Sequence, residues 1–178
     1  LEAVAYCANN GQTKYIPMAD DLIELIGRAQ QPDGYLNTYY TVREPGQRWQ
    51  NLTEGHELYS AGHLIEAAVA YYEATGKRRL LEIASKFADL ICRVFGPGEE
   101  QRHGYPGHQE IELALLKLAN LCREIGGSYA AKADAYTELA SFFLRTRGDH
   151  EGRHGTSFWP EGCQDYAPIT EQQQLLSH

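Results

Sequence analysis

The chain has 178 residues, of which 43% are hydrophobic and 22% charged, and its formal net charge is −8 at pH 7. This composition suits one globular domain with a buried core and argues against a disordered chain. No apolar run reaches the ~20 residues of a membrane-spanning helix, and the scattered Lys and Arg residues argue against a nucleic-acid partner. We therefore expect a cytoplasmic protein with no membrane partner and a neutral or weakly charged ligand.

The first predicted helices lie before residue 30. Residues 1–6 have a helix-like composition, and apolar residues then recur at the i, i+3, i+4, i+7 spacing of a buried helix face at Leu22, Leu25, Ile26 and Ala29. This spacing predicts a helix that packs against the core through those side chains.

Residues 31–40 (QPDGYLNTYY) interrupt the helical pattern with a stretch too short for a helix. Pro32 and Gly34 supply turn chemistry, while tyrosines and an asparagine offer flat rings beside hydrogen-bonding groups. A sugar needs both, because its C–H faces stack on rings and its hydroxyls need positioned donors and acceptors. The segment is therefore predicted to be a sugar-binding loop, or else a structural turn whose tyrosines pack between helices.

Helical periodicity resumes after this loop and continues to about residue 144. The same spacing recurs at Leu58, Ala61, Ile65, Ala68 and Tyr72. Further helices are expected at 80–94, 111–121 and 130–144, separated by glycines at 76, 96, 98, 126 and 127. No alternating strand pattern competes, so the sequence predicts an all-α fold.

The helices also repeat as hairpins, because His56 and His108 lie 52 residues apart at matching places before successive helices. Tandem helical hairpins of this length stack either as an open superhelix or as a closed ring with alternating inner and outer helices. The polar, aromatic-rich loops gather before the inner helices, as they would around a central cavity. This arrangement favours the ring.

Matching positions in the repeat should bring His56 and His108 together on one rim. Near them in the sequence or in the predicted ring are Asn51, Tyr35 and Tyr105. A neutral imidazole donates from one nitrogen and accepts at the other, which suits a sugar hydroxyl. These five residues are the candidate substrate-binding set. The alternative is that both histidines only cap or pack at helix starts.

The sequence gives weaker signals for a metal site, for paired catalytic carboxylates and for reactive cysteines. His56, His63 and Glu66 recur with roughly helical spacing, but the zinc-protease pattern His-Glu-x-x-His is absent because Ser60 stands at the second histidine's place, so we expect no metal within this chain. The acids at positions 54, 57, 110 and 112 lie near the presumed rim, yet carboxylates favour helix N-termini for structural reasons. The four cysteines form no Cys-x-x-Cys pair and are interpreted as mostly free thiols.

Three segments resemble a known family: residues 31–39 (QPDGYLNTY), residues 51–68 (which include HELY and AGHLIEAA) and residues 103–112 (HGYPGHQEIE). Together they resemble glycoside hydrolase family 127, the β-L-arabinofuranosidases, from about residue 19 to residue 178. The resemblance implies an (α/α)6 barrel, followed in full-length members by β-sandwich domains. It also implies release of terminal L-arabinofuranose with retention, by a zinc-bound cysteine nucleophile and a glutamate general acid/base. Zinc would hold the thiol as thiolate.

The same resemblance assigns sugar contacts to His56 and His108 by motif position, and to His178 at the start of a later helix. The segment before His178 departs from the family pattern, because Thr170 replaces an arginine. None of Cys7, Cys92, Cys122 and Cys163 corresponds to the nucleophile, and the acid/base and zinc ligands have no counterpart here. We therefore expect zinc only in the full-length protein, and no catalytic residue or turnover in this chain.

Both ends fall inside helix-like segments, so we expect residues 1–178 to be an incomplete (α/α) barrel from a longer protein. Its first and last helices would then expose apolar faces and favour oligomer formation or weak stability. Two other readings stay open. One is a different (α/α) barrel carbohydrate enzyme, of the unsaturated glucuronyl hydrolase or sugar epimerase type, with acidic catalytic residues in this segment. The other is a non-catalytic helical-repeat scaffold.

Overall fold

The structure is a computed structural model that describes residues 1–52 and 54–147. The elements in chain order are α1 (Glu2–Asn9), the short 3-10 helix η1 (Thr13–Tyr15), α2 (Ile16–Ala29), α3 (Thr38–Val42), α4 (Glu57–Thr75), α5 (Arg79–Val94), α6 (Ile111–Ile125) and α7 (Gly127–Thr146). Within these residues the β-structure amounts to an isolated bridge between Phe95 and Arg102. The prediction of an all-α fold is confirmed.

Glycines end two of the long helices as the sequence predicts. Gly76 ends α4 with φ +71°, and its N–H donates to the Tyr72 carbonyl at 2.7 Å. Gly126 ends α6 with φ +76°. A residue with a Cβ is strained at such positive φ values, which is why glycine marks these stops so clearly in the sequence.

Residues 31–40 are not entirely a loop, because Thr38 begins the short helix α3. The Asn37 side chain causes this, since its Oδ1 accepts the backbone N–H groups of Tyr39 at 3.1 Å and Tyr40 at 3.3 Å. Such a side-chain cap satisfies N–H groups that a helix start leaves unpaired. The prediction that the whole segment is too short for a helix is therefore wrong for its last residues.

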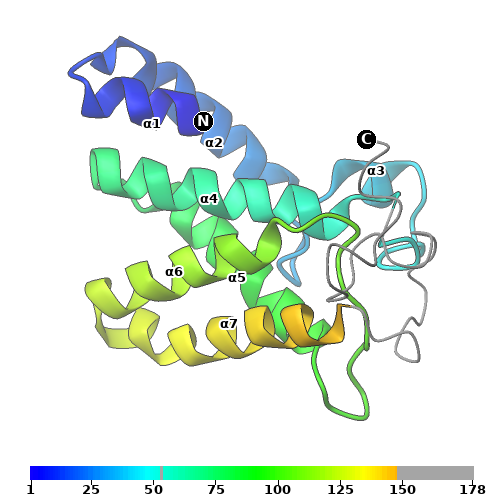
Figure 1. The fold of residues 1–178 in the computed structure, drawn as a ribbon. Helices are drawn as coiled ribbons and strands as arrows, with labels where there is room; N and C mark the ends of the chain where they lie inside the picture. The colour runs from blue at the N-terminus through cyan, green and yellow to red at the C-terminus, as the bar shows by residue number, and fades with distance from the viewer. Residues whose placement is uncertain (53, 148–178) are drawn as a thin grey trace, which may run out of the picture.

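The helices form hairpins that pack side by side around α4. Helix α4 contacts α1, α5 and α6, and α6 packs along α7. The segments that lead into α4 and α6 lie at the same side of the molecule, near α3 (Figure 1). The fold thus brings the two loops that carry His56 and His108 to one end of the helices.

The core runs between these helices and contains Leu58, Ile65 and Leu118 without exposed surface. Helix α2 departs from the sequence prediction, because Ala19 and Ile23 are its buried residues. Leu22 and Leu25 are 44% and 55% exposed. Helix α2 contacts α5, α1 and η1, and part of its apolar surface stays exposed. In residues 1–52 and 54–147, no helix combines the length and hydropathy needed to cross a bilayer.

Candidate functional site

The rings of His56 and His108 lie against each other at the shared end of α4 and α6. Their centroids are 5.2 Å apart and their planes differ by 23°. Tyr59, one turn into α4, has its ring centroid 5.9 Å from that of His56 and 5.3 Å from that of His108. Both histidines are partly exposed. The predicted meeting of the two imidazoles on one rim is confirmed.

His56 has an unusual backbone conformation at the position before α4, with φ +52° and ψ +23°. A non-glycine residue in this left-handed region costs about 1 kcal/mol or more, so the surrounding structure must hold it there. Its side chain does not cap the helix. Instead Nδ1 lies 2.6 Å from the Glu54 carbonyl oxygen. Because a carbonyl only accepts, Nδ1 carries a proton in this contact, and in the neutral ring Nε2 is left as an acceptor.

His108 lies three residues before α6, which begins at Ile111, where the sequence predicted a helix start. The residue before the helix is Glu110, whose φ of −149° and ψ of −51° are not helical. The Gly107 N–H donates to the Leu52 carbonyl at 3.3 Å, which joins the two loops that carry the histidines.

A fully buried carboxylate supports the loop before His56. Glu57 accepts a hydrogen bond from the Tyr35 hydroxyl and another from the Trp49 backbone N–H at 2.7 Å. Burial raises the pKa of Glu57, and these two hydrogen bonds oppose that effect. Trp49 also has a positive φ of +65°, so the carboxylate holds a strained turn. Sequence reasoning treated Glu57 only as a helix-terminus acid and missed this role.

Tyr35 is part of that support and has no exposed surface. Its ring packs edge-on against Trp49 and Phe87 at centroid distances of 5.2 and 5.6 Å, and the Arg48 guanidinium lies 3.8 Å from its centroid. The structure therefore places Tyr35 in the core behind the rim, as in the alternative reading of its segment. It offers no surface to a ligand in this structure.

Tyr105 is likewise buried beside the loop that carries His108. Arg147 lies 5.0 Å from the Tyr105 ring centroid and donates to Glu112 Oε1 at 2.8 Å and to the Pro106 carbonyl at 3.2 Å. Glu112 also accepts the Glu110 N–H at 3.2 Å. A buried ion pair thus fixes the turn on both sides of His108.

Asn51 is exposed and shapes the turn before His56. Its Oδ1 accepts the Glu54 N–H at 2.9 Å, and its carbonyl accepts the Gly55 N–H at 3.0 Å. A Cβ on Gly55 would lie 2.3 Å from the Tyr40 hydroxyl, so only glycine fits there. Contact of Asn51 with a sugar stays a prediction. His178 lies outside the described residues.

Three potential metal ligands also meet near this rim, although the sequence led us to expect no metal. One ligand atom each from His63, Glu66 and Glu110 lies within 4.8 Å of the other two. His63 and Glu66 share a face of α4, and their spacing in the sequence indicates this much. Glu110 comes from the next hairpin, so sequence spacing could not reveal it.

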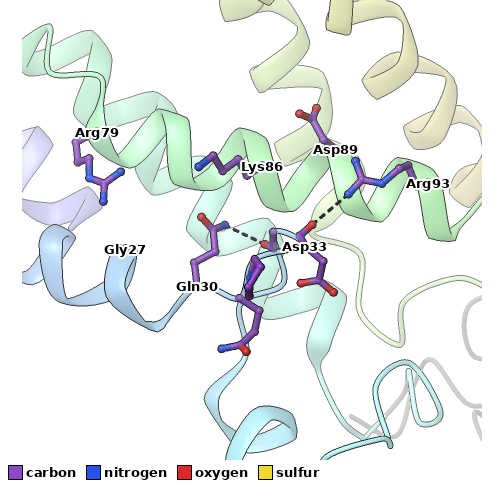
Figure 2. Close-up of a pocket in the computed structure, with 10 residues that line it drawn as sticks. Gly27, Gln30, Asp33, Arg79, Lys86, Asp89 and Arg93 are labelled. Carbon is purple, nitrogen blue, oxygen red and sulfur yellow. Dashed lines mark hydrogen bonds between the residues drawn. The ribbon is translucent and has the colours of Figure 1, made fainter.

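A separate hollow of about 360 Å³ lies on the outer side of the loop after α2. Figure 2 shows Gln30 and Arg93 bonded to this loop: the Gln30 amide donates to the Gly34 carbonyl at 2.9 Å, and Arg93 donates to the Asp33 carbonyl at 3.1 Å. A Cβ on Gly34, whose φ is +100°, would lie 2.5 Å from the Lys86 carbonyl oxygen. These contacts clamp the loop to α5, and the hollow includes neither His56 nor His108.

The described cysteines do not fit a zinc-thiolate centre. Burial raises the pKa of Cys92 to about 12 and that of Cys122 to about 11, which keeps both as neutral thiols. Cys7 is also free, and none of these three belongs to the His63 cluster. Cys163 lies outside the described residues. No catalytic step through zinc can be built on the described thiols.

Comparison with known proteins identifies the family. Residues 1–178 match the model of the β-L-arabinofuranosidase GH127 catalytic domain. The chain belongs to glycoside hydrolase family 127. This confirms the resemblance drawn from the HELY and HGYPGH segments and, with the observed helices, the partial (α/α) barrel.

Three relatives illustrate the similarity. The non-reducing end β-L-arabinofuranosidase of Bifidobacterium longum subsp. longum is 45% identical over 153 residues, which cover 83% of this chain and 22% of the relative. A GH127 β-L-arabinofuranosidase structure from Geobacillus stearothermophilus T6 is 56% identical, with a TM-score of 0.76 over 86% of this chain and 23% of that one. A second GH127 β-arabinofuranosidase structure is 40% identical, with a TM-score of 0.68 over 83% of this chain and 24% of that one. The chain thus spans less than a quarter of the length of these relatives.

Proposed function

We propose that this chain is one part of the catalytic barrel of a retaining glycoside hydrolase that releases terminal β-L-arabinofuranose. In this proposal residues 1–178 form an incomplete (α/α) barrel that supplies one wall of the sugar-binding cleft. Family membership supports the reaction class, and the named activities of the relatives support the sugar. The alternatives of a glucuronyl hydrolase, an epimerase or a scaffold gain no such support.

The observation that carries the proposal is the stacked pair of His56 and His108. Two partly exposed imidazoles with ring centroids 5.2 Å apart bring two hydrogen-bonding side chains to one place. His56 offers Nε2 as an acceptor because the Glu54 carbonyl occupies Nδ1. Adjacent hydroxyls of a furanose need this kind of closely spaced donor and acceptor set. The Tyr59 ring lies against both imidazoles and helps to fix their orientation.

Buried groups hold the pair in place and so act on substrate only through it. Glu57 and Tyr35 fix the loop before His56, and Arg147 with Glu112 fixes the turn around His108. A bound zinc, which the family implies, would keep a nucleophilic cysteine ionised as its thiolate, and by motif position no cysteine of this chain corresponds to that residue. The described residues therefore bind and orient the sugar, and the proposed catalytic groups lie elsewhere in the longer protein.

Hydrolysis of p-nitrophenyl β-L-arabinofuranoside by the protein at the full length of its relatives tests the proposal. His56→Ala and His108→Ala should each lower kcat/KM by about 100-fold, because each removes a hydrogen bond worth about 2–3 kcal/mol in the transition state. His103→Ala is the matched control, since this exposed side chain packs edge-on to Phe142 with ring centroids 5.9 Å apart and should leave kcat/KM unchanged. Hydrolysis of the arabinofuranoside by both rim variants at the unaltered rate would exclude the sugar-binding role.

A further inference from the structure

A polar cluster separate from the stacked histidines lies where the start of α6 meets α4. His63 and Glu66 lie three residues apart on α4, and Glu110 is the residue before α6. His63 Nδ1 is 3.1 Å from Glu110 Oε1. Gly62 makes the approach possible, because a Cβ there would lie 2.7 Å from Glu110 Cγ. Two hairpins thus contribute ligand atoms to one point.

This cluster sets two carboxylates beside one imidazole and one ammonium group. One carboxylate oxygen of Glu66 and one of Glu110 lie within 4.8 Å of each other. Glu110 Oε1 is buried, and His63 Nδ1 lies 3.1 Å from it without the geometry of a hydrogen bond. Lys117 Nζ pairs with Glu66 Oε1. Two carboxylates at such close range need a shared proton or a further cation between them.

We propose that His63, Glu66 and Glu110 bind one divalent first-row transition-metal ion, of the class of Zn²⁺ or Mn²⁺. An imidazole with carboxylates suits these ions, whereas Mg²⁺ and Ca²⁺ prefer oxygen ligands alone. Ligand bonds of about 2.1 Å place the donors of a tetrahedral ion roughly 3.4 Å apart. The three ligand atoms lie within 4.8 Å of one another, so small side-chain rotations complete the site.

The surroundings give a cation access to this point. A hollow of about 330 Å³ opens beside Glu66 between α1, α4 and α6. The carboxylates that line it are Glu2, Glu66, Glu73 and Glu124, against one cation, Lys117. His63 is half-exposed on the other side of the cluster. This acidic surface attracts cations and leaves room for water to complete the coordination.

A bound ion would tie α4 to the segment that leads into α6. The Tyr59 ring connects this point to the stacked histidines, because its centroid is 4.5 Å from that of His63 and 5.3 Å from that of His108. No cysteine is among the proposed ligands. Its effect is to fix the relative position of the two loops.

Isothermal titration of the whole 178-residue chain with ZnCl₂ and with MnCl₂ tests the proposal, with CoCl₂ as a spectroscopic probe. We expect one ion per chain and a rise in melting temperature on binding. His63→Ala and Glu110→Gln should each weaken binding by more than about tenfold. Lys117→Met should strengthen it, because this change removes the competing cation from Glu66. That gain is measurable even where a loss variant folds poorly.

Two control variants separate this cluster from other ligands of the chain. Glu73 lines the same hollow but is not a proposed ligand, so the Glu73→Gln variant should bind the ion as the parent does. A His150→Ala/His154→Ala variant removes two histidines outside the described residues and should also retain the ion. No binding by the parent chain, or binding that survives His63→Ala and Glu110→Gln but is lost in the His150/His154 variant, would overturn the proposal.

Discussion

The Tyr35 hydroxyl donates a hydrogen bond to Glu57, a carboxylate without exposed surface that is the chain neighbour of His56. The two residues are 22 positions apart, so the bond joins the loop after α2 to the start of α4. The second acceptor oxygen of Glu57 holds the Trp49 N–H at 2.7 Å. The Glu57 side chain thus connects Tyr35 and Trp49 to the start of α4. His56, which has the left-handed backbone, is the residue directly before Glu57.

Replacing Glu57 by Gln should alter how stability depends on pH. Burial raises the folded-state pKa of Glu57 above its ordinary value of 4.5, so between these two values the folded protein keeps a proton that the unfolded chain has released. The Glu57 contribution to the free energy of unfolding is therefore full below about pH 4.5 and falls as the pH rises through the folded pKa. The deficit of Glu57→Gln relative to the parent should be largest near pH 4 and shrink toward pH 7.

Urea unfolding of both proteins from pH 4 to pH 7 measures this difference. Carboxylates such as Asp20, whose pKa is lowered, destabilise both proteins equally at low pH and cancel in the comparison. Tyr35→Phe is the matched variant, because it removes one hydrogen bond and keeps the acid. A Glu57→Gln deficit that grows with pH would contradict the raised pKa.

The buried pair of Arg147 and Glu112 should be costly to break from either side. Both side chains are almost fully buried and their atoms are 2.8 Å apart. Arg147→Met leaves the Glu112 charge without this partner, so we expect a loss of about 3–5 kcal/mol in the free energy of unfolding. Glu112→Gln should also destabilise the protein, and the double variant should lose less than the sum of the two, because it leaves no unpaired charge.

The same pair bears on the proposed sugar-binding site. Arg147 holds the Pro106 carbonyl and Glu112 holds the Glu110 N–H, so the turn around His108 depends on both. If the proposed function holds, Arg147→Met in the protein at the full length of its relatives should therefore raise KM for the arabinofuranoside, even at a temperature where the variant is fully folded. Arg123→Met is the control, because its contacts with Asp134 and Thr137 are exposed. An unchanged KM for Arg147→Met would show that the turn holds without the pair.

The positions of the long helices followed from the sequence because helical spacing and glycine stops are local properties. The rim pair of His56 and His108 followed from the repeat, since matching places in successive hairpins lie side by side. The inner face of α2 did not follow, because Leu22 and Ile23 are equally apolar and only the neighbour α5 decides which is buried. The packing partner, rather than the helix itself, sets that choice.

The supporting carboxylates were harder to predict for a similar reason. Glu57 looks like any acid in a first helical turn, and its burial depends on Tyr35 from an earlier loop. Tyr35 itself resembled a ligand contact because the sequence alone does not distinguish a tyrosine that binds a ligand from one that is buried. Glu110 meets His63 only because Gly62 lets the two hairpins approach, and no spacing within one helix records such a contact.

The described thiols should react slowly with alkylating agents. Burial raises the pKa of Cys92 to about 12 and that of Cys122 to about 11, so almost no thiolate is present at pH 8. Iodoacetamide labelling followed by peptide mass spectrometry should leave both positions largely unmodified in the native chain and label them after unfolding in urea. Rapid native labelling of Cys122 would show that the α6–α7 contact opens readily.

The contact between α4 and the start of α6 should make Gly62 sensitive to a single methyl group. A Cβ at this position would lie 2.7 Å from Glu110 Cγ and 3.0 Å from the Ile111 backbone nitrogen. Alanine favours a helix over glycine by about 1 kcal/mol, whereas overpacking costs about 1–3 kcal/mol. The Glu110 side chain can move aside, but the backbone at Ile111 can do so only if α6 shifts, so we expect Gly62→Ala to lower the free energy of unfolding.

Ser60 is exposed on the same helix, so Ser60→Ala should change the free energy of unfolding by less than about 0.5 kcal/mol. Urea midpoints of the two variants decide the matter, and a Gly62→Ala variant more stable than the parent would mean that the two hairpins separate easily at the point where the rim loops meet.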